Sequence, residues 1–456
     1  MLNLDLATIA RCTGGRLLGA DAHVTSVSTD TRNLADGALF VALRGERHDA
    51  HLFLEDARGA GAAAALVERP IDSDLPQVIV ADTQLALGRI AAEVRRQRDV
   101  CVIGITGSNG KTTVKSLLAG ILSRHAPTHF SSGSFNNEIG LPLTLLGMPA
   151  DSRFLVLEMG AGKPGDIDYL VRIAQPRIGL VNNIAPAHLE RMGSIDGIAE
   201  TKGALYSGLP EDGVAVINAD DAYAGYFTKL AGSRRVIRFG LAASADVSAR
   251  FDRNGIESSF DLVYAGEAIR IELPLQGRHN VFNALAAASL ALAVGVPLAT
   301  IRVGLESAVA VAGRTARRAH GTGAVIIDDS YNANPASFAA AIDTLAECEG
   351  QRILVIGDMR ELGREARRLH AEIGELARQR GIDRLYAVGE LSSAASRAFG
   401  ERARHFADQA ALIEALREEL KPGRTLLIKG SRGSAMDKVV TALFADGTAE
   451  GGRHAA

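Results

Sequence analysis

The segment that most constrains the fold is residues 103–113, "IGITGSNGKTT", in which an apolar run enters a glycine turn and leaves it as a helical pattern. Glycine permits a tight turn and lets backbone N–H groups approach phosphate oxygens, and a helix N-terminus adds partial positive charge. The pattern departs from GxxxxGK[ST], because Ile105 stands where the first glycine belongs. The sequence therefore predicts a nucleotide-binding phosphate loop of an unusual type.

Residues at the ends of the apolar strands carry the candidate chemistry. Lys111 supplies a positive charge for the outer phosphates of a nucleotide, and the hydroxyl of Thr112 or Thr113 can bind Mg²⁺. A later apolar strand in "FLVLEMGAG" ends in Glu158, and ligands gather at the carboxyl edge of such sheets. Because Mg²⁺ prefers oxygen ligands, Glu158 is a candidate for the same site.

The chain length and its changes of pattern predict three domains. Its 456 residues allow about three domains of roughly 150 residues each. We expect an N-terminal domain over 1–98, a central domain over 99–312 and a C-terminal domain over 313–456. The first combines short β-like runs ("ALFVAL", "AALVE", "QVIVA") with a helix near Leu85–Gln97, which indicates a small α/β domain.

The other two domains alternate apolar strands with helical patterns, as parallel βαβ units require. The C-terminal domain contains five strand–helix repeats, from "GAVIIDD" to "TLLIKG", and these predict a Rossmann-like doubly wound sheet. The central domain is expected to have a parallel sheet of the P-loop type, followed by a more antiparallel stretch over 234–275. Its strands are expected at Cys101–Thr106, Phe154–Glu158, Ile178–Asn182 and Val214–Asn218.

Composition argues against several classes of protein. The formal net charge of -3 leaves no polybasic surface for nucleic acid. Cys12, Cys101 and Cys348 are far apart and odd in number, which argues against a disulfide framework or a zinc cluster and fits a reducing cytoplasm. The N-terminus shows no signal-peptide pattern. Residues 283–301 are about as long as a membrane span but mainly alanine, so we expect a buried helix ending near Gly295. The final "GTAEGGRHAA" is expected to be disordered.

Five collinear stretches resemble the Mur ligases, the ATP-dependent amide-forming enzymes of peptidoglycan precursor synthesis. They are "TGSNGKTT", "LEMG", "NNIAPAHLERMGS", "ETKGALY" and "GRHNVFNALAAA". That family shares a core with folylpolyglutamate synthetases, and its phosphate loop lacks the first glycine of the usual motif. The stretches "DDSYNANPASF", "GDMRELG" and "SFNNEIGLPLTLL" resemble the member that adds D-alanyl-D-alanine to UDP-N-acetylmuramoyl-tripeptide (UDP-MurNAc-tripeptide). The N-terminal "DTRNLADGALFVALRGERHDAH" is similar to the UDP-binding domain shared with the tripeptide-forming member, whose "DNPR" signature this sequence lacks.

The resemblance implies an ADP-forming ligase of cell-wall synthesis in the cytoplasm, a monomer without nucleic-acid or membrane partners. ATP would phosphorylate the terminal carboxylate of the tripeptide to an acyl phosphate. The amine of D-alanyl-D-alanine would then attack, and phosphate would leave through a tetrahedral oxyanion. Negative charge builds on the phosphoryl oxygens and then on the oxyanion, so the site needs fixed cations. Three domains that share one site imply closure about hinges near residues 98–100 and 311–314.

The resemblance also implies roles for individual residues. Thr112 and Glu158 resemble ligands of the magnesium ion of ATP, and His188 resembles a contributor to a second ion. Lys202 matches the lysine that CO₂ carbamylates, which would give a metal site an anionic pair of oxygens; spacing alone singles out neither His188 nor Lys202. The expected catalytic residues are Lys111, Glu158, His188 and Lys202. Asn280 and Asn283 are expected on the adenine side of ATP. The full set of expected ATP contacts is Gly107, Ser108, Asn109, Gly110, Lys111, Thr112, Thr113, Asn280, Asn283, Arg314 and Asp328.

The substrate contacts are expected on three separate loops. The uridine diphosphate is assigned to Thr29, Thr31 and Arg32. The muramyl-peptide is assigned to Asn136 and Asn137, and D-alanyl-D-alanine to Tyr331, Asn332 and Asn334. Two positions depart from the family pattern, since Arg191-Met192 replaces Gly-Phe and Ala312 replaces Pro. Neither departure removes a chemical group that the reaction needs.

Three alternatives stay open on the sequence. One is another ligase of the same superfamily, of the tripeptide-forming, folylpolyglutamate or cyanophycin type. The second is a P-loop switch that hydrolyses nucleotide to regulate a partner, and the third is an inactive nucleotide-binding scaffold. An amine-dependent release of phosphate distinguishes a ligase from the other two.

Overall fold

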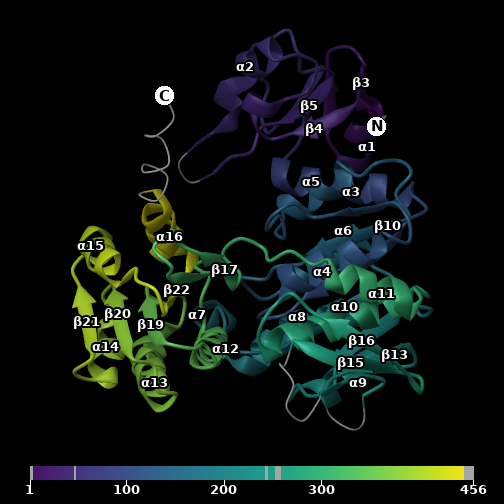
Figure 1. Ribbon diagram of the computed structural model, residues 1–456. Coiled ribbons are helices and arrows are strands. Elements are labelled where there is room, and N and C mark those ends of the chain that lie inside the picture. Colours follow the sequence, from purple (N-terminus) through teal and green to yellow (C-terminus); the bar gives the residue numbers. More distant parts are fainter. Residues whose placement is uncertain (1–3, 46–47, 242–244, 252–257, 446–456) are drawn as a thin grey trace, which may run out of the picture.

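The computed structural model describes residues 4–45, 48–241, 245–251 and 258–445. Within these ranges the strands form sheets of nine, six, five and two strands. Figure 1 shows three bodies in chain order, each built around one of the larger sheets. The expected three-part α/β architecture is confirmed. The last ten residues, expected to be disordered, lie outside the described residues.

The N-terminal sheet has the order β2-β7-β6-β5-β4, with β4 to β7 parallel and β2 antiparallel to β7. Helix α3 begins two residues before its expected start because the Asp82 carboxylate accepts a hydrogen bond from Leu85 N and caps the helix. The elements are β1 (Leu4–Asp5), α1 (Leu6–Thr13), β2 (Arg16–Leu18), β3 (His23–Val24), β4 (Ser26–Ser28), η1 (Thr31–Asn33), β5 (Ala38–Val41), η2 (Ala50–Phe53), α2 (Leu54–Gly59), β6 (Ala64–Val67), β7 (Gln77–Ile79) and α3 (Thr83–Arg96).

The central sheet has the order β16-β15-β14-β13-β12-β11-β8-β10-β9. Its strands are β8 (Cys101–Thr106), β9 (Thr128–Phe130), β10 (Phe154–Glu158), β11 (Ile178–Val181), β12 (Val214–Asn218), β13 (Arg235–Phe239), β14 (Val247–Phe251), β15 (Ser259–Tyr264) and β16 (Glu267–Glu272). Its helices are α4 (Lys111–Leu122), α5 (Gly140–Leu146), α6 (Asp166–Ala174), α7 (Leu189–Met192), α8 (Ile195–Ser207), α9 (Ala224–Ala231), α10 (Arg278–Ala293) and α11 (Leu298–Glu306).

The expectation of an antiparallel stretch over 234–275 is only partly right. Strand β13 pairs in parallel with β12, because helix α9 provides the crossover between them. The antiparallel pairing is confined to β14, β15 and β16. A two-residue turn joins β15 to β16, and both turn residues, Ala265 and Gly266, have the positive φ angles (50° and 84°) that favour such hairpins.

The C-terminal sheet has the order β17-β18-β22-β19-β20-β21, and every pair is parallel except β17 with β18. The five predicted strand–helix repeats are confirmed, whereas the edge strand β17 was not predicted. The elements are β17 (Ala316–Ala319), β18 (Val325–Asp329), α12 (Pro335–Ala346), β19 (Gln351–Ile356), η3 (Gly363–Glu365), α13 (Ala366–Gln379), β20 (Arg384–Val388), α14 (Ser393–Phe399), β21 (Ala403–Phe406), α15 (Gln409–Glu419), β22 (Arg424–Lys429), η4 (Arg432–Ser434) and α16 (Met436–Ala445).

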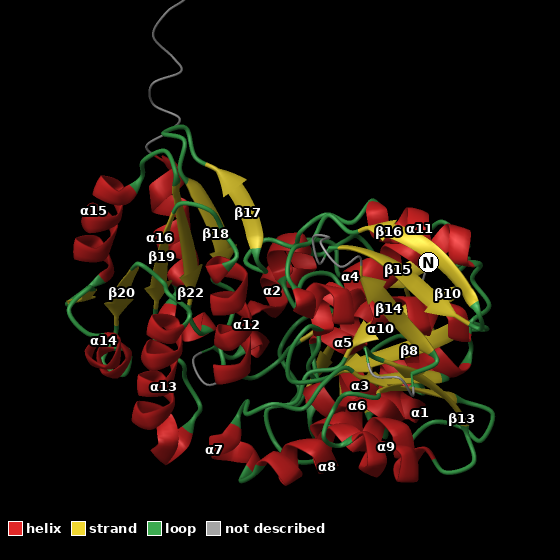
Figure 2. Cartoon of the chain, turned by 60° about the horizontal axis from the view of Figure 1, so that its bottom comes forward, coloured by secondary structure: helices red, strands yellow, loops and turns green. Residues whose placement is uncertain are grey.

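Packing joins these parts differently on the two sides of the central sheet. One face is covered by α4, α10 and α11. On the other face, a single apolar cluster runs from the N-terminal sheet through α3 to α5 and α6. Figure 2 shows α7 and α12 between the central and C-terminal sheets. Helix α10 ends at Ala293, and among the described helices none is long and apolar enough to cross a membrane.

Candidate active site

A cavity of about 770 Å³ lies between the carboxyl edges of the central and C-terminal sheets. The central part contributes the turn after β8, the ends of β10 and β11, and the start of α10. The C-terminal part contributes the loop after β18 and Lys429 at the end of β22. Carboxyl edges of parallel sheets are where ligands bind, so this cavity is the candidate active site.

The turn from β8 into α4 needs glycine at Gly110. Its φ angle is 80°, in the left-handed region, and it stands at the N-cap of α4. A Cβ atom there would lie 2.3 Å from Asn283 Oδ1 and 2.5 Å from Asn182 Nδ2. Both the backbone conformation and the close approach therefore exclude a side chain.

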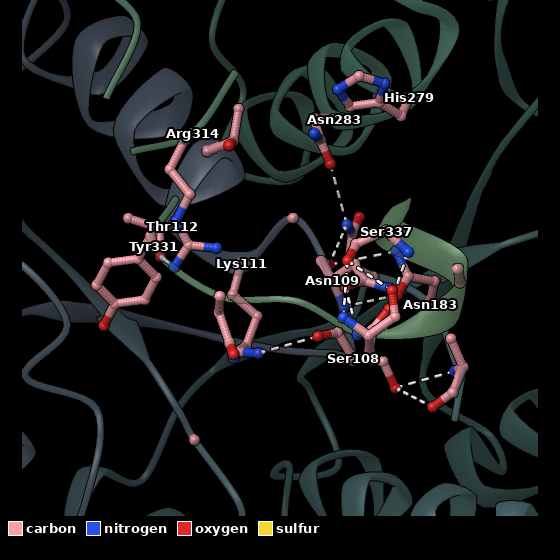
Figure 3. Close-up of a pocket in the computed structure, with 18 of the residues that line it drawn as sticks. Ser108, Asn109, Lys111, Thr112, Asn183, His279, Asn283, Arg314, Tyr331 and Ser337 are labelled. Atoms are coloured by element: carbon pink, nitrogen blue, oxygen red, sulfur yellow. Dashed lines mark hydrogen bonds between the residues drawn. The ribbon is translucent and has the colours of Figure 1, made fainter. Parts of the chain in front are cut away.

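Polar side chains around the turn hold it in one conformation (Figure 3). Asn109 N donates to Asn183 Oδ1 at 2.8 Å, and Asn182 Nδ2 donates to Asn109 O at 3.0 Å. Ser108 Oγ accepts a hydrogen bond from Ala185 N and donates to Ala185 O, both at 2.9 Å. The loop is therefore shaped before any ligand binds.

Lys111 folds back over the loop, where its Nζ donates to Gly107 O at 2.7 Å. Burial lowers the pKa of Lys111, while the Glu158 carboxylate opposes that change. The lysine is thus next to the positions where the N–H groups of the loop would donate hydrogen bonds to phosphate oxygens. Thr113, on the same turn, also lines the cavity.

Glu158, at the end of β10, is the centre of a buried polar cluster. Thr112 Oγ1 donates to Glu158 Oε2 at 2.9 Å, and Asn136 Nδ2 donates to Glu158 Oε1 at 2.7 Å. Lys115 Nζ lies 3.7 Å from Glu158 Oε2 and donates to Gly133 O at 2.6 Å. A buried carboxylate needs such partners. Asn137, next to Asn136, lines the cavity as well.

The role of Lys115 was missed from the sequence. It stands four residues after Lys111 and so on the same face of α4. That spacing was the available signal, but a helical lysine is usually solvated, whereas Lys115 is 2% exposed.

Arg314 reaches the phosphate loop from the C-terminal part. Its Nη2 donates to Thr112 Oγ1 at 3.1 Å, and its guanidinium carbon lies 4.1 Å from the centre of the Tyr331 ring. Asp328 was predicted to contact ATP, but it is absent from the cavity lining and accepts hydrogen bonds from Gly313 N, Ser330 N and Ser330 Oγ. It therefore holds the residue before Arg314 and the start of the loop after β18.

The two asparagines assigned to the adenine side begin helix α10. Asn283 Nδ2 donates to Asn280 Oδ1, and Asn283 Oδ1 accepts from Asn182 Nδ2, both at 3.1 Å. Within the described residues, the buried Asn182 Oδ1 has no hydrogen-bond partner. A second cavity of about 390 Å³ shares Thr113, Asn280 and Arg314 with the first and has apolar walls that include Leu275.

The loop after β18 brings three of the predicted dipeptide residues to the cavity: Tyr331, Asn332 and Asn334. Asn334 also makes two structural contacts: its Nδ2 donates to Asn109 Oδ1 at 2.8 Å, and its Oδ1 caps α12. Lys429 Nζ donates to Asp329 Oδ2 at 2.6 Å and to Asn332 O at 3.0 Å. This buried pair fixes the loop beside the cavity, and the sequence alone did not single it out.

His188 and Lys202 lie near Lys111 in different ways. His188 lines the cavity, and its Nδ1 contacts a carboxylate oxygen of Glu361. Burial lowers the pKa of His188, the neighbouring Glu361 carboxylate opposes that change, and the charges of Lys111 and Lys202 add to the lowering. Lys202 is 2% exposed in α8. Burial and the Lys111 charge hold the pKa of Lys202 well below its usual value, so this amine is driven toward its neutral form.

The residues assigned to uridine diphosphate lie elsewhere. Thr29 and Thr31 follow β4 at the carboxyl edge of the N-terminal sheet, and neither they nor Arg32 line the cavity described above. Arg32 is exposed and donates to both carboxylate oxygens of Asp30. These hydrogen bonds lower the pKa of Asp30 to about 2. The structure leaves these three assignments as predictions.

Thr112 and Glu158 are the predicted ligands of a magnesium ion. In the part of the chain that the structure describes, no three or more His, Cys, Asp or Glu side chains gather in a way that could hold a metal ion. Thr112 and Glu158 do supply adjacent oxygen atoms, 2.9 Å apart. Mg²⁺ in nucleotide sites commonly takes only one or two protein oxygens and completes its shell with phosphate and water, so these two residues fit.

Two family models match most of the central and C-terminal parts of the chain. The family model described as Mur ligase middle domain matches residues 105–291, and that described as Mur ligase, glutamate ligase domain matches residues 313–432. The UDP-N-acetylmuramoyl-tripeptide–D-alanyl-D-alanine ligase of Escherichia coli (strain K12) is 45% identical over 454 residues, 98% of this chain and 100% of that protein.

Two solved structures extend the likeness to three dimensions. A crystal structure of MurF from Acinetobacter baumannii is 35% identical, has a TM-score of 0.91 and covers 98% of this chain and 99% of that one. MurF ligase from Thermotoga maritima, in complex with ADP, is 28% identical with a TM-score of 0.83 and covers 93% of this chain and 98% of that one. Matched along nearly its whole length in sequence and in fold, the chain belongs to the Mur ligase family.

Proposed function

We propose that this protein is an ATP-dependent, ADP-forming ligase that joins D-alanyl-D-alanine to UDP-MurNAc-tripeptide in peptidoglycan precursor synthesis. The observation that carries the proposal is the cavity in which a phosphate loop of the central part faces the loop of Tyr331, with Arg314 bonded to Thr112 between them. The 45% identity with the Escherichia coli ligase over almost the full chain supports the choice of substrates.

The phosphate loop serves the first step. The terminal carboxylate of the tripeptide attacks the γ-phosphorus of ATP, the bond from that phosphorus to the ADP oxygen breaks, and an acyl phosphate forms. Lys111, which folds back over the phosphate loop, and Arg314, which donates to Thr112, neutralise charge on the transferring phosphoryl group. The N-terminus of α4 adds partial positive charge at the same place.

The second step uses the loop after β18. The neutral amine of D-alanyl-D-alanine attacks the acyl carbon and loses a proton, and inorganic phosphate leaves as the amide forms. Tyr331, Asn332 and Asn334 stand on the C-terminal wall of the cavity, opposite the phosphate loop. We assign the dipeptide to that wall. We assign the muramyl-peptide to Asn136 and Asn137, which lie in the loop between β9 and α5, where Asn136 donates to Glu158 at the end of β10.

We assign magnesium to Thr112 and Glu158, with His188 and Lys202 as contributors to a second ion. A magnesium ion bound there would stabilise the negative charge on the phosphoryl oxygens. The low pKa of Lys202 favours the neutral amine, which is the form that adds to CO₂ to give a carbamate. Asn280 and Asn283 are assigned to the nucleoside end, where the second cavity offers apolar walls.

We further propose domain boundaries after residues 98 and 312, with uridine diphosphate bound by Thr29, Thr31 and Arg32. No described strand pairing crosses either boundary, which supports them. We also propose a monomer located in the cytoplasm. The three cysteines of the chain are free in the structure, as a reducing compartment would leave them.

The test measures phosphate release with UDP-MurNAc-tripeptide in the presence of D-alanyl-D-alanine, of D-alanine or of neither. We expect release only with the dipeptide, matched by formation of the extended UDP-MurNAc-peptide. Release with D-alanine alone, or only with another UDP-muramyl precursor, would point to a different ligase of the superfamily. ATP turnover without any amine would favour the nucleotide switch.

A further inference from the structure

A contact between the central and C-terminal parts ends on His188. The imidazole Nδ1 of His188, in the loop after β11, contacts a carboxylate oxygen of Glu361, in the loop after β19. The two residues are 173 positions apart in the chain. His188 lines the cavity, whereas Glu361 is absent from the cavity lining, so Glu361 lies behind the histidine.

The backbones of the two loops also meet. Glu190 N donates to Glu361 O at 3.3 Å, so main-chain atoms join the second residue of α7 to the residue two positions before η3. Both His188 (φ 55°) and Glu361 (φ 64°) adopt the left-handed conformation that side chains rarely take. Such conformations persist where the surroundings fix them, and they gather at functional sites. Figure 2 shows α7 extending toward α13, which follows η3.

The loop that carries Glu361 is rigidly held by its own part of the chain. Met359 N donates to His370 Nε2 at 2.9 Å, and Arg360 N donates to Ser431 Oγ at 2.9 Å. Asp358 O accepts from Ser434 Oγ at 2.7 Å and from Ser431 N at 3.1 Å. These hydrogen bonds fix the backbone that precedes Glu361, so the position of its side chain does not depend on a flexible segment.

We propose that Glu361 is a positioning residue that orients His188, so that the histidine is set for catalysis only when the C-terminal part is in place. A carboxylate can only accept a hydrogen bond, so its contact fixes the proton on Nδ1 and leaves the Nε2 lone pair for the cavity. A carboxylate behind a histidine in this way fixes the orientation of its ring. The inference rests on the proposed function for its kinetic consequence but not for the tautomer of His188.

The tautomer is measured directly on the full chain labelled with [15N]histidine. The His188 signal, one of eleven histidines, is identified by its loss in His188→Gln. We expect the Nδ1–H form in the wild type and in Glu361→Gln, whose amide oxygen still accepts, and loss of that form in Glu361→Ala. Glu365→Ala is the matched control, because Glu365 is exposed and pairs with Arg368. An unchanged His188 signal in Glu361→Ala would overturn the inference.

Kinetics separate positioning from inhibition. Glu361→Ala is expected to lower kcat by about tenfold to a hundredfold, the range found for such supporting carboxylates, with a smaller loss for Glu361→Gln and none for Glu365→Ala. A rise in kcat for Glu361→Ala would mean that the contact blocks His188, and the inference would be wrong. If the wild type fails to join the dipeptide to the tripeptide, the proposed function fails, while the tautomer result stands by itself.

Discussion

Arg314 Nη2 donates a hydrogen bond to Thr112 Oγ1 at 3.1 Å, although the two residues lie 202 positions apart and in different parts of the fold. The same hydroxyl donates to Glu158 Oε2 at 2.9 Å. One threonine on the first turn of α4 therefore joins a cation of the C-terminal part to a carboxylate of the central sheet. Phosphoryl transfer would take place beside this chain of contacts.

Replacing Arg314 with methionine should lower kcat/KM by at least about 100-fold, because a cation aimed at the transferring phosphoryl group is lost. Arg314→Lys should retain only part of the wild-type kcat/KM, since lysine lacks the planar group that stacks on Tyr331. Steady-state phosphate release measures both. The control is Arg317→Met, because Arg317 also reaches the central part, at Gln276, but away from the cavity. Equal losses in the two methionine variants would contradict the assignment.

Gly110→Ala should abolish nucleotide binding, measured by isothermal titration calorimetry. Alanine at φ 80° costs about 1–2 kcal/mol, and its Cβ would meet Asn283 Oδ1 at 2.3 Å. The loop must therefore move away from the shape that receives phosphate. Gly225→Ala is the control, because nothing lies within 4 Å of its added Cβ. Wild-type affinity in Gly110→Ala would show that this turn does not bind the nucleotide.

Lys115→Met should reduce the free energy of unfolding by about 3–5 kcal/mol, because it removes the buried ammonium group that lies 3.7 Å from the Glu158 carboxylate. The double variant Lys115→Met/Glu158→Gln should recover much of that loss, since the uncompensated charge is then removed as well. Urea denaturation of the wild type, the two single variants and the double variant gives the coupling energy. Strictly additive effects would mean that the two residues do not interact.

Lys202→Met should abolish ligation, and bicarbonate should not restore it. Measured without CO₂, so that Lys202 is an unmodified amine, the variant should also be more stable than the wild type near neutral pH. The folded-state pKa of Lys202 is far below that of the unfolded chain, so the unfolded state binds the proton more readily and stability rises with pH. The difference in Tm between the variant and the wild type should therefore shrink as the pH rises toward about 10, the usual lysine value. A variant that stays fully active would remove Lys202 from the mechanism.

The sequence was most informative where local chemistry dictates local structure. The strands at Cys101–Thr106 and Phe154–Glu158 appear where the apolar runs predict them, and the glycine turn between strand and helix is present. Those patterns depend on neighbouring residues only. The roles of His188 and Lys202 were predicted from the family resemblance alone, because periodicity could not distinguish them from ordinary residues.

What the sequence could not predict are contacts between distant segments. Lys115 has the pattern of a solvated helical lysine until β10 places Glu158 against it. Asn334 was assigned to the dipeptide, yet it also bonds to Asn109 of the phosphate loop. Glu361 was quoted only as part of a motif, and its contact with His188 depends on how two sheets pack together. Tertiary packing decides such pairs, and spacing along the chain does not encode it.

The most direct measurement follows an oxygen atom. UDP-MurNAc-tripeptide labelled with ¹⁸O in its terminal carboxylate is incubated with ATP, D-alanyl-D-alanine and the enzyme, and the released phosphate is analysed by mass spectrometry. If ATP activates the acid as an acyl phosphate, each phosphate carries one ¹⁸O atom from the peptide. Unlabelled phosphate would mean that water attacks ATP instead, and the account of a ligase would be contradicted.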